Sequence, residues 1–171
     1  MKKIIWTFGL IAGGVMSAFM AVTVALSRDT NEHSLLLGYA GLVAGFLLVF
    51  FGIRAYRENV GGGAITFGRA FLIGLAITLI ASVCYTATWE VVYFKFMPDF
   101  ADKYGEYAMK KMHEEGKSEA EMAKKKAQLD KFAQNYKNPF YNAAMTMMEP
   151  LPVGLLITLV SAGILRRKRR D

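Results

Sequence analysis

The sequence has very little of what disulfide-rich proteins and metalloproteins use. Among 171 residues there are one cysteine and two histidines, and only 20% of the residues are charged. One cysteine cannot form an intramolecular disulfide, and a thiolate metal site needs more than one. The histidines, His33 and His113, are too far apart in sequence to show a metal-ligand spacing. The composition therefore predicts no disulfide framework, no metal site and no cofactor, and Cys84 is expected to be a small buried hydrophobic residue.

Motifs of the common enzyme classes are also missing from the sequence. It contains no H-E-x-x-H, no C-x-x-C, no P-loop and no set of serine, histidine and aspartate typical of hydrolases. Methionine thioethers can bind Cu(I), but the spacing of the methionines matches no compact copper motif. We therefore expect a protein that is not an enzyme.

What the sequence has instead is long apolar runs, in a chain that is 54% hydrophobic. The four runs are residues 4–26, 35–53, 70–94 and 140–165. Glu90 and Glu149 are their only charged residues. Because a helix needs about 20 apolar residues to cross the hydrocarbon core, we predict an all-α membrane protein with four transmembrane helices in a single membrane domain, residues 1–171. Aromatic residues expected at the membrane–water interfaces are Trp6, Tyr85, Trp89, Tyr93 and Tyr141.

The distribution of lysine and arginine predicts how the chain is oriented. The formal net charge of +7 comes mainly from three short segments, residues 1–3, 54–69 and 166–171. Four spans place all three on one side of the membrane, and the positive-inside rule assigns that side to the cytoplasm. Both termini are then cytoplasmic, and Arg54, Arg57 and Arg69 are basic anchors at the inner face. This pattern is not a nucleic-acid footprint. The expected partners are the lipid bilayer and either another protein or a second copy of the chain.

Two further features complete the predicted topology. The first apolar run is longer than the apolar region of a signal peptide, which is about 7–15 residues, so we expect it to remain as a span. Residues 95–139 form a long polar link on the extracytoplasmic side. Apolar residues recur there at helical spacing on both sides of Gly116, and Ser118 with Glu121 matches a capping box. The link is therefore predicted to be an extracytoplasmic helical hairpin between the third and fourth spans.

Small residues recur along every run, mostly at every fourth position. They are Gly9, Gly13, Ser17, Ala21 and Ala25 in the first run; Gly38, Gly41, Gly45 and Gly52 in the second; Ala70, Gly74, Thr78, Ser82 and Thr86 in the third; and Gly154, Thr158 and Ala162 in the fourth. Small residues let helices pack closely in lipid, so we expect a tight bundle. The ridges alone do not distinguish packing within one chain from packing against a second copy. Pro150 and Pro152 predict that the last helix kinks or restarts near Glu149.

Glu90 and Glu149 are the candidate functional residues. At a rise of about 1.5 Å per residue, both lie in the outer third of the bilayer. Thr86 precedes Glu90 by one helical turn, and Asn142, Thr146 and Glu149 form a second polar stripe at i, i+4 and i+7. Two carboxylates in a partly dry site can share a proton or a cation. The alternative is that each carboxylate is hydrated or pairs with a nearby cationic side chain, namely Arg28, His33 or Lys95.

The link between the second and third runs carries the most specific pattern. It reads Arg54-Ala55-Tyr56-Arg57, then Gly61-Gly62-Gly63, then Ile65-Thr66-Phe67-Gly68. Together with Met97-Pro98-Asp99-Phe100 and a proline-containing last span before a basic tail, it resembles a widespread bacterial membrane family known only as a domain of unknown function. The similarity extends over nearly the whole chain. It implies a four-span protein of the bacterial inner membrane and carries over no activity, ligand or catalytic residue.

The sequence favours a membrane protein that acts by interaction with a partner, such as a small accessory subunit. The alternative is a small ion-coupled transporter that uses the carboxylates near the outer face. Transporters usually carry a charge near the bilayer centre, and none of the four runs has one. A closed polar cavity around Glu90 and Glu149 would favour transport, whereas exposure to water beside the hairpin would favour interaction.

Overall fold

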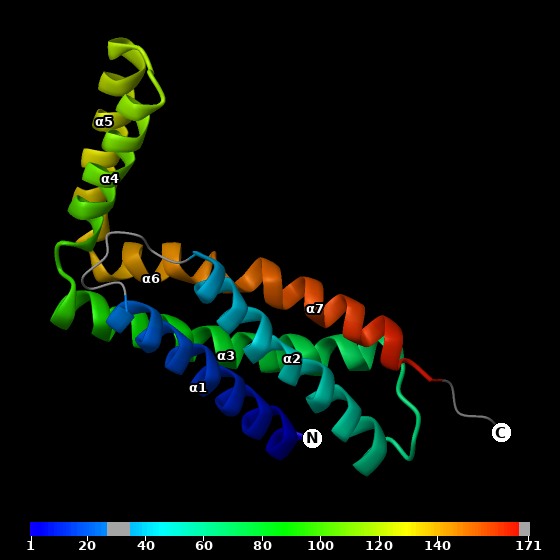
Figure 1. Ribbon diagram of the computed structural model, residues 1–171. Coiled ribbons are helices and arrows are strands. Elements are labelled where there is room, and N and C mark those ends of the chain that lie inside the picture. Colours follow the sequence, from blue (N-terminus) through cyan, green and yellow to red (C-terminus); the bar gives the residue numbers. More distant parts are fainter. Residues whose placement is uncertain (27–34, 168–171) are drawn as a thin grey trace. The chain divides into compact units, whose positions relative to one another are not determined.

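The computed structural model describes residues 1–26 and 35–167, and within them every extended regular element is a helix (Figure 1). The helices are α1 (Lys2–Leu26), α2 (Leu35–Asn59), α3 (Phe67–Phe96), α4 (Phe100–Glu114), α5 (Glu119–Tyr136), α6 (Pro139–Met147) and α7 (Pro150–Leu165). The predicted all-α class is confirmed. The loop that contains Arg28 and His33 lies outside the described residues.

Four helical segments are long and apolar enough to cross a membrane. They are Lys2–Leu26, Gly38–Asn59, Phe67–Phe96 and Pro139–Leu165. The number of spans is therefore as predicted, but the helices are longer than the apolar runs. The second helix continues through Arg54 and Arg57 to Asn59, and the third begins at Phe67, before Arg69. Apolarity marks only the part of a helix suited to hydrocarbon, whereas the backbone hydrogen bonds continue into the flanking polar residues.

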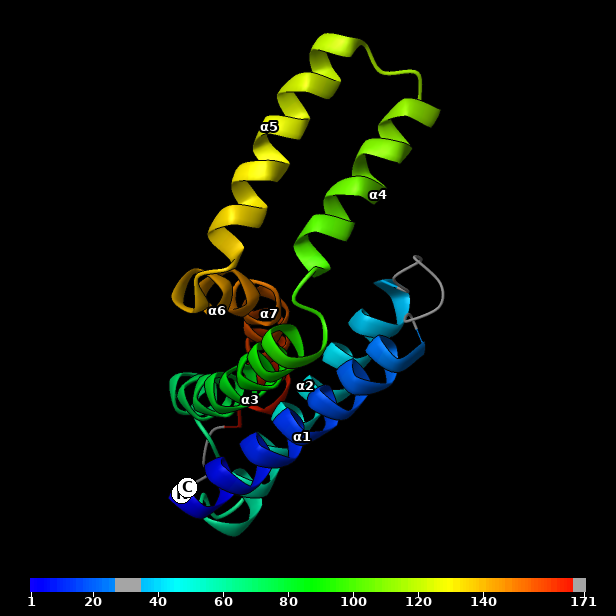
Figure 2. The same ribbon diagram turned by 90° about the vertical axis from the view of Figure 1, so that its left-hand side faces the viewer.

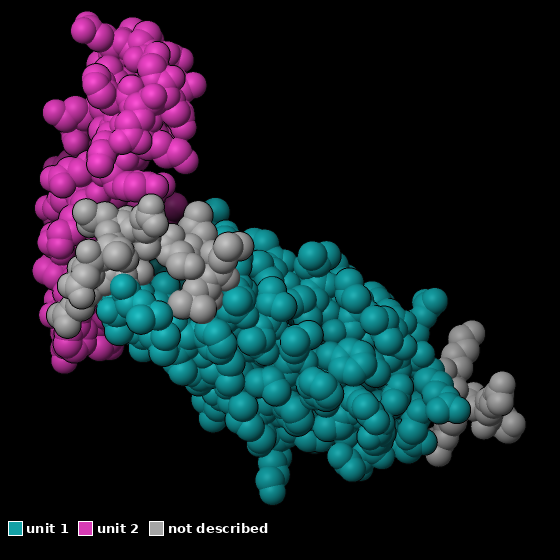
Figure 3. All heavy atoms as spheres, viewed as in Figure 1, with its two compact units in different colours: residues 1–88, 146–171 teal, residues 89–145 magenta. Residues whose placement is uncertain are grey.

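The chain divides into two compact units (Figure 3). Unit 1 consists of Met1–Thr88 and Thr146–Asp171, and unit 2 is Trp89–Met145. The boundaries fall inside α3 and α6, so both helices contribute residues to both units.

Unit 1 has a core made by α1, α2, α3 and α7. The α1 and α2 helices run side by side (Figures 1 and 2), and α2 also packs against α7. Phe46, Val49 and Ile53 of α2 are completely buried at the centre. Exposed leucine, valine and phenylalanine side chains cover the outer faces of the same helices, as expected for surfaces that meet lipid.

The predicted ridges of small residues bring these helices together within one chain. A Cβ atom added at Gly9 would lie 2.8 Å from the Cβ atom of Ile80, and one added at Gly74 would lie 2.8 Å from Cγ2 of Thr158. Each is shorter than a normal carbon–carbon contact of about 3.5–4.0 Å. Glycine at these positions therefore lets α3 approach α1 and α7. The end of the first ridge differs, because Ala21 and Ala25 are exposed.

Unit 2 contains the predicted helical hairpin, formed by α4 and α5. Gly116 ends the first helix with a φ of +69°, which favours glycine. The predicted capping box is present, since the Ser118 hydroxyl accepts a hydrogen bond from the Glu121 amide while the Glu121 carboxylate accepts one from the Ser118 amide. Tyr93, Ala101, Ala133 and Tyr136 form the core of this unit.

The fourth span is broken, as its prolines predicted. The α6 helix ends at Met147 and α7 begins at Pro150, with Glu149 at the N-cap position. Proline has no amide hydrogen, so the backbone hydrogen-bond pattern cannot run unbroken through Pro150 and Pro152. Proline is well tolerated in the first turn of a helix, and both prolines lie in the first turn of α7.

Candidate functional site

The α3 helix carries a row of buried hydroxyl groups in unit 1. Thr78, Ser82 and Thr86 follow one another at every fourth residue, and all three are buried. The Thr78 hydroxyl lies 3.0 Å from that of Thr158 in α7, and the two share a hydrogen bond between completely buried side chains. The Ser82 Oγ atom is buried without a hydrogen-bond partner among the described residues. The row is the most polar part of the helix interface in this unit.

Glu149 lies at the break of the fourth span and is held by α3. The Tyr85 hydroxyl donates a hydrogen bond of 3.0 Å to Oε2 of Glu149, while the Glu149 residue itself is exposed. The next residue of α3, Thr86, donates a longer bond of 3.8 Å to the Met147 sulfur. Thr146, on the predicted stripe, is buried. Tyr85 was expected only as an interface anchor, and its spacing in the sequence gave no sign of a bond to a residue 64 positions away.

Glu90 and Asn142 belong to unit 2. The Oε1 atom of Glu90 is buried and has no hydrogen-bond partner in the part of the chain that the structure describes. No ion pair joins Glu90 to Lys95 there, although that pairing was one of the sequence alternatives. Asn142 is completely buried, and its Nδ2 atom donates a hydrogen bond of 3.2 Å to the backbone oxygen of Tyr136. Asn142 therefore stabilises the end of α5.

The five predicted site residues are thus divided between the units. Thr86, Thr146 and Glu149 are in unit 1, and Glu90 and Asn142 are in unit 2. A shared site of Glu90 and Glu149 stays a prediction.

Aromatic residues precede and follow Glu90 in the sequence, and their side chains form much of the core of unit 2. Trp89 donates a hydrogen bond of 2.9 Å from Nε1 to the Tyr136 hydroxyl and makes an edge contact with Phe100. Tyr93 was expected as an interface anchor but is only 1% exposed, because its ring packs edge-on against Tyr136. The ring of Tyr93 therefore lacks the exposure expected of an interface anchor, because α5 and the start of α4 cover it.

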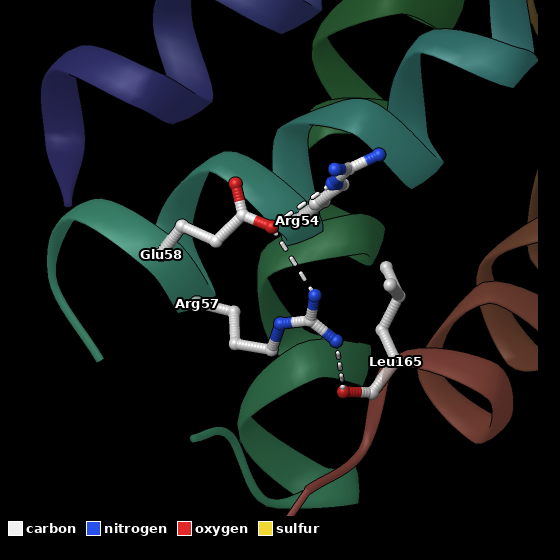
Figure 4. Close-up of polar contacts among 4 residues, drawn as sticks. All are labelled: Arg54, Arg57, Glu58 and Leu165. Carbon is white, nitrogen blue, oxygen red and sulfur yellow. Dashed lines mark hydrogen bonds and ion pairs between the residues drawn. The ribbon is translucent and has the colours of Figure 1, made fainter. Parts of the chain in front are cut away.

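The three predicted anchor arginines have different surroundings in unit 1, and Figure 4 shows those of Arg54 and Arg57. Arg54 and Arg57 both bind the Glu58 carboxylate, at 2.9 Å and 3.2 Å. Arg57 also donates a hydrogen bond of 3.4 Å to the backbone oxygen of Leu165 at the end of α7. A guanidinium group there satisfies a terminal carbonyl and complements the negative end of the helix dipole. Arg57 therefore connects the end of α2 to the end of α7.

The loop between α2 and α3 and the start of the basic tail are also joined. Ile65 and Arg167 form an isolated antiparallel β-bridge, with backbone hydrogen bonds of 3.0 Å and 2.9 Å. Gly62 and Gly63 have φ values of +61° and +82°, so the glycine-rich turn uses conformations that other residues rarely adopt. Arg69 has its guanidinium carbon 5.6 Å from the centre of the Tyr56 ring. This distance is suitable for a cation–π contact.

The hairpin of unit 2 has a groove that the sequence analysis did not predict. Its volume is about 440 Å³, and Asp102, Glu106 and Asp130 are among the residues that line it. Gly105 lies in the same groove, where its missing side chain leaves space between α4 and α5. The acidic side chains are on two different helices, so their approach depends on the pairing of the hairpin. Within the described residues, no group of three or more histidine, cysteine or acidic side chains is arranged to hold a metal ion.

Comparison with known proteins assigns the chain to a family that has no known activity. No curated protein matches this chain, and no solved structure matches it. Residues 7–167 match a family described as "Protein of unknown function (DUF4199)". This range includes all four candidate spans apart from the first residues of α1, together with the whole hairpin. The chain therefore belongs to the DUF4199 family of proteins of unknown function.

Proposed function

We propose that this protein is a non-enzymatic protein of the bacterial inner membrane that acts by binding a partner protein outside the cytoplasm. In this proposal both termini and the α2–α3 loop are cytoplasmic, and the α4–α5 hairpin is extracytoplasmic. Support for the orientation comes from the cationic side chains. Lys2, Lys3, Arg57, Arg69 and Arg167 all lie at the ends of helices that meet at one end of unit 1 (Figure 1).

The orientation can be tested by cysteine labelling. The native Cys84 is first replaced, as Cys84→Ala, and single cysteines are then introduced as Tyr107→Cys in the hairpin or Asn59→Cys at the end of α2. Both positions are exposed. In intact spheroplasts, a membrane-impermeant maleimide should label the cysteine at position 107, and should label that at position 59 only after permeabilisation. The opposite pattern would contradict the proposed orientation.

The observation that carries the interaction role is the exposed surface of the hairpin. Tyr104 and Tyr107 of α4 are each 46% exposed, and Tyr104 lines a second groove of the hairpin, of about 360 Å³, together with Phe100 and Phe132. Tyrosine is enriched in protein interfaces, where it combines a large apolar ring with a hydroxyl group. An exposed pair of tyrosines, one of which lines a groove with other aromatic rings, is therefore a suitable contact surface for another protein.

Site-specific photo-crosslinking in the native membrane tests this role. A photoreactive benzoylphenylalanine at position 107 should give one discrete adduct with a different protein. The control is the same residue at position 117, in the connection between α4 and α5, where the exposed side chain is a flexible lysine. Equal adducts at both positions, adducts only with a second copy, or no adduct would refute a specific partner at the tyrosine surface.

A second candidate function, ion-coupled transport, is favoured by the buried hydroxyl row of α3. Thr78, Ser82 and Thr86 form a polar row next to the broken span, and Glu149 lies in that break, at the N-cap of α7. Reconstituted protein should then conduct protons or alkali ions across a liposome membrane, and Glu149→Gln should reduce the flux. Glu115→Gln in the hairpin is the control. Absence of flux from the wild-type protein would exclude this function under the tested gradient.

A further inference from the structure

The end of unit 1 where α1 begins and α7 ends has a strongly positive surface (Figure 1). In the described segments 1–3, 54–69 and 166–167, seven cationic side chains are accompanied by a single carboxylate, Glu58. The cationic residues are Lys2, Lys3, Arg54, Arg57, Arg69, Arg166 and Arg167. They come from the start of α1, the end of α2, the start of α3 and the end of α7. Four helices that are far apart in sequence therefore contribute charge to one place.

The structure separates these cations into two groups. Arg54 and Arg57 are neutralised in part by Glu58, which accepts hydrogen bonds from both. The remaining five form no ion pair with any other residue that the structure describes, and we call them the free basic surface: Lys2, Lys3, Arg69, Arg166 and Arg167. The free basic surface therefore has positive charge available for a ligand. Of the three predicted anchors, only Arg69 belongs to it.

Three arginines of the free basic surface are attached to ordered backbone or to an aromatic ring. The β-bridge to Ile65 fixes the backbone of Arg167, and the Arg57 bond to Leu165 fixes the turn before Arg166. Arg69 is held by its contact with the Tyr56 ring. Because the backbone of Arg166 and Arg167 and the side chain of Arg69 are ordered in advance, a ligand loses less binding energy to restricting them. A guanidinium group also presents several donors in a planar fork that matches the oxygens of a phosphate.

Apolar side chains lie directly beside these cations in the sequence of the same helices. Trp6 in α1 follows Lys2 and Lys3, and Phe67 and Leu72 flank Arg69 in α3. All three apolar side chains are exposed, Leu72 by 65%. A free phosphate ion would use only the cations. A phospholipid would use both features, with its phosphate at the basic groups and its acyl chains along the exposed apolar faces.

We propose that the free basic surface binds the headgroup of an anionic phospholipid, with Arg69, Arg166 and Arg167 as the phosphate-contacting residues. This proposal rests on insertion of the bundle into a membrane, but not on the proposed partner protein or on transport. Arg57 has a positioning role, since it holds the end of α7 beside the α2–α3 loop.

Native mass spectrometry of the full-length protein in detergent can test the proposal. The protein is titrated separately with phosphatidylglycerol, which is anionic, and with phosphatidylethanolamine, which is zwitterionic. The triple variant Arg69→Gln, Arg166→Gln and Arg167→Gln removes three positive charges from the surface. A matched triple variant, Lys111→Gln, Lys124→Gln and Lys131→Gln, removes three positive charges from the hairpin. These lysines are exposed and form no ion pair with another described residue.

The wild-type protein should prefer phosphatidylglycerol, and the surface variant should lose that preference. A basic residue near an anionic membrane surface contributes about 1 kcal/mol, so each removed charge should weaken binding by roughly fivefold. The hairpin variant should bind as the wild type does. If the triple variant folds poorly, two single variants that keep Arg166 and Arg167 replace it in the test. Of these, Arg69→Lys should retain more lipid affinity than Arg69→Gln.

Three results would overturn the proposal. The first is equal binding of the two lipids by the wild type. The second is an equal loss of binding in the surface and hairpin variants, which would indicate a general effect of net charge. The third is full displacement of the lipid by inorganic phosphate at the same concentration, which would indicate a soluble anion as the ligand. A missing crosslink at Tyr107 would leave the lipid proposal untouched, so the two proposals can fail separately.

Discussion

Two neighbouring glycines of α1 provide a direct test of how the helices of unit 1 pack. Gly13 is buried, and a Cβ atom added there would lie 2.5 Å from the Cβ atom of Cys84 in α3. Gly14 is exposed, and a Cβ atom added there would meet no other atom within 4 Å. The substitutions Gly13→Ala and Gly14→Ala therefore make the same chemical change at adjacent positions of one helix, with and without a neighbour.

The expected effects have opposite signs. Alanine is favoured over glycine inside a helix by about 1 kcal/mol, so Gly14→Ala should leave the free energy of unfolding unchanged or raise it by up to that amount. At Gly13 the new methyl group would be about 1 Å too close to its neighbour, since carbon atoms prefer about 3.5–4.0 Å. The Cβ atom of Cys84 cannot rotate away, so α1 and α3 must separate. Overpacking of this kind costs about 1–3 kcal/mol.

Both variants gain the same helix propensity, so they should differ in free energy of unfolding by the overpacking cost alone, about 1–3 kcal/mol. Titration of the detergent-solubilised protein with sodium dodecyl sulfate, followed by tryptophan fluorescence, measures this difference. Trp6 and Trp89 provide the signal. Equal stability of the two variants, within about 0.5 kcal/mol, would mean that α1 and α3 do not pack through Gly13, and the assigned role of the small-residue ridge would be wrong.

Two further predictions concern single hydrogen bonds. A double-mutant cycle with Thr78→Val and Thr158→Val should give a coupling energy of about 0.6–1.7 kcal/mol, since the two hydroxyls are bonded inside the bundle, and additive effects in the same unfolding assay would contradict that bond. In the hairpin, hydrogen bonds from the hydroxyl and amide of Ser118 lower the pKa of Glu121 below its usual value. The capping box should therefore stabilise α5 at neutral pH and lose this contribution as the pH falls through the lowered pKa of Glu121. Ser118→Ala should move the loss toward higher pH, as measured by amide hydrogen exchange in the first turn of α5, and an unchanged pH profile would refute the assignment.

Features that depend on neighbours along the chain could be predicted from the sequence. The four spans follow from the length of the apolar runs, and the break at Pro150 follows from the missing amide hydrogen of proline. The capping box of Ser118 and Glu121 could be predicted because its two residues are only three positions apart, and their two hydrogen bonds confirm it. The ridges of small residues were also predicted as packing surfaces, and the structure confirms this at Gly9, Gly74 and Gly154 but not at the exposed Ala21 and Ala25.

Features that depend on pairing between distant segments could not be predicted in this way. The partner of Glu149 is Tyr85, 64 residues earlier, and nothing in the spacing of either residue indicates the other. From the sequence, Arg54, Arg57 and Arg69 were likewise predicted to be one group of anchors. In the structure Arg57 binds the end of α7 and Arg69 contacts the ring of Tyr56, because helix ends from four parts of the chain meet there. Such contacts require the fold, and periodicity contains no information about them.

The break in the fourth span connects the packing of unit 1 to the position of its exposed carboxylate. Pro150 cannot donate a backbone hydrogen bond to Thr146, which is four residues earlier. The amide of Glu149 donates to the Thr146 oxygen instead, at 3.2 Å, so the carbonyl that proline leaves without its usual donor is satisfied by a tighter turn. This turn places Glu149 at the start of α7, where the Tyr85 hydroxyl from α3 reaches its carboxylate. A carboxylate is also stabilised by the positive end of a helix dipole. The proline therefore does more than bend the span, because the turn that replaces its missing hydrogen bond places Glu149 where the Tyr85 hydroxyl binds its carboxylate to α3.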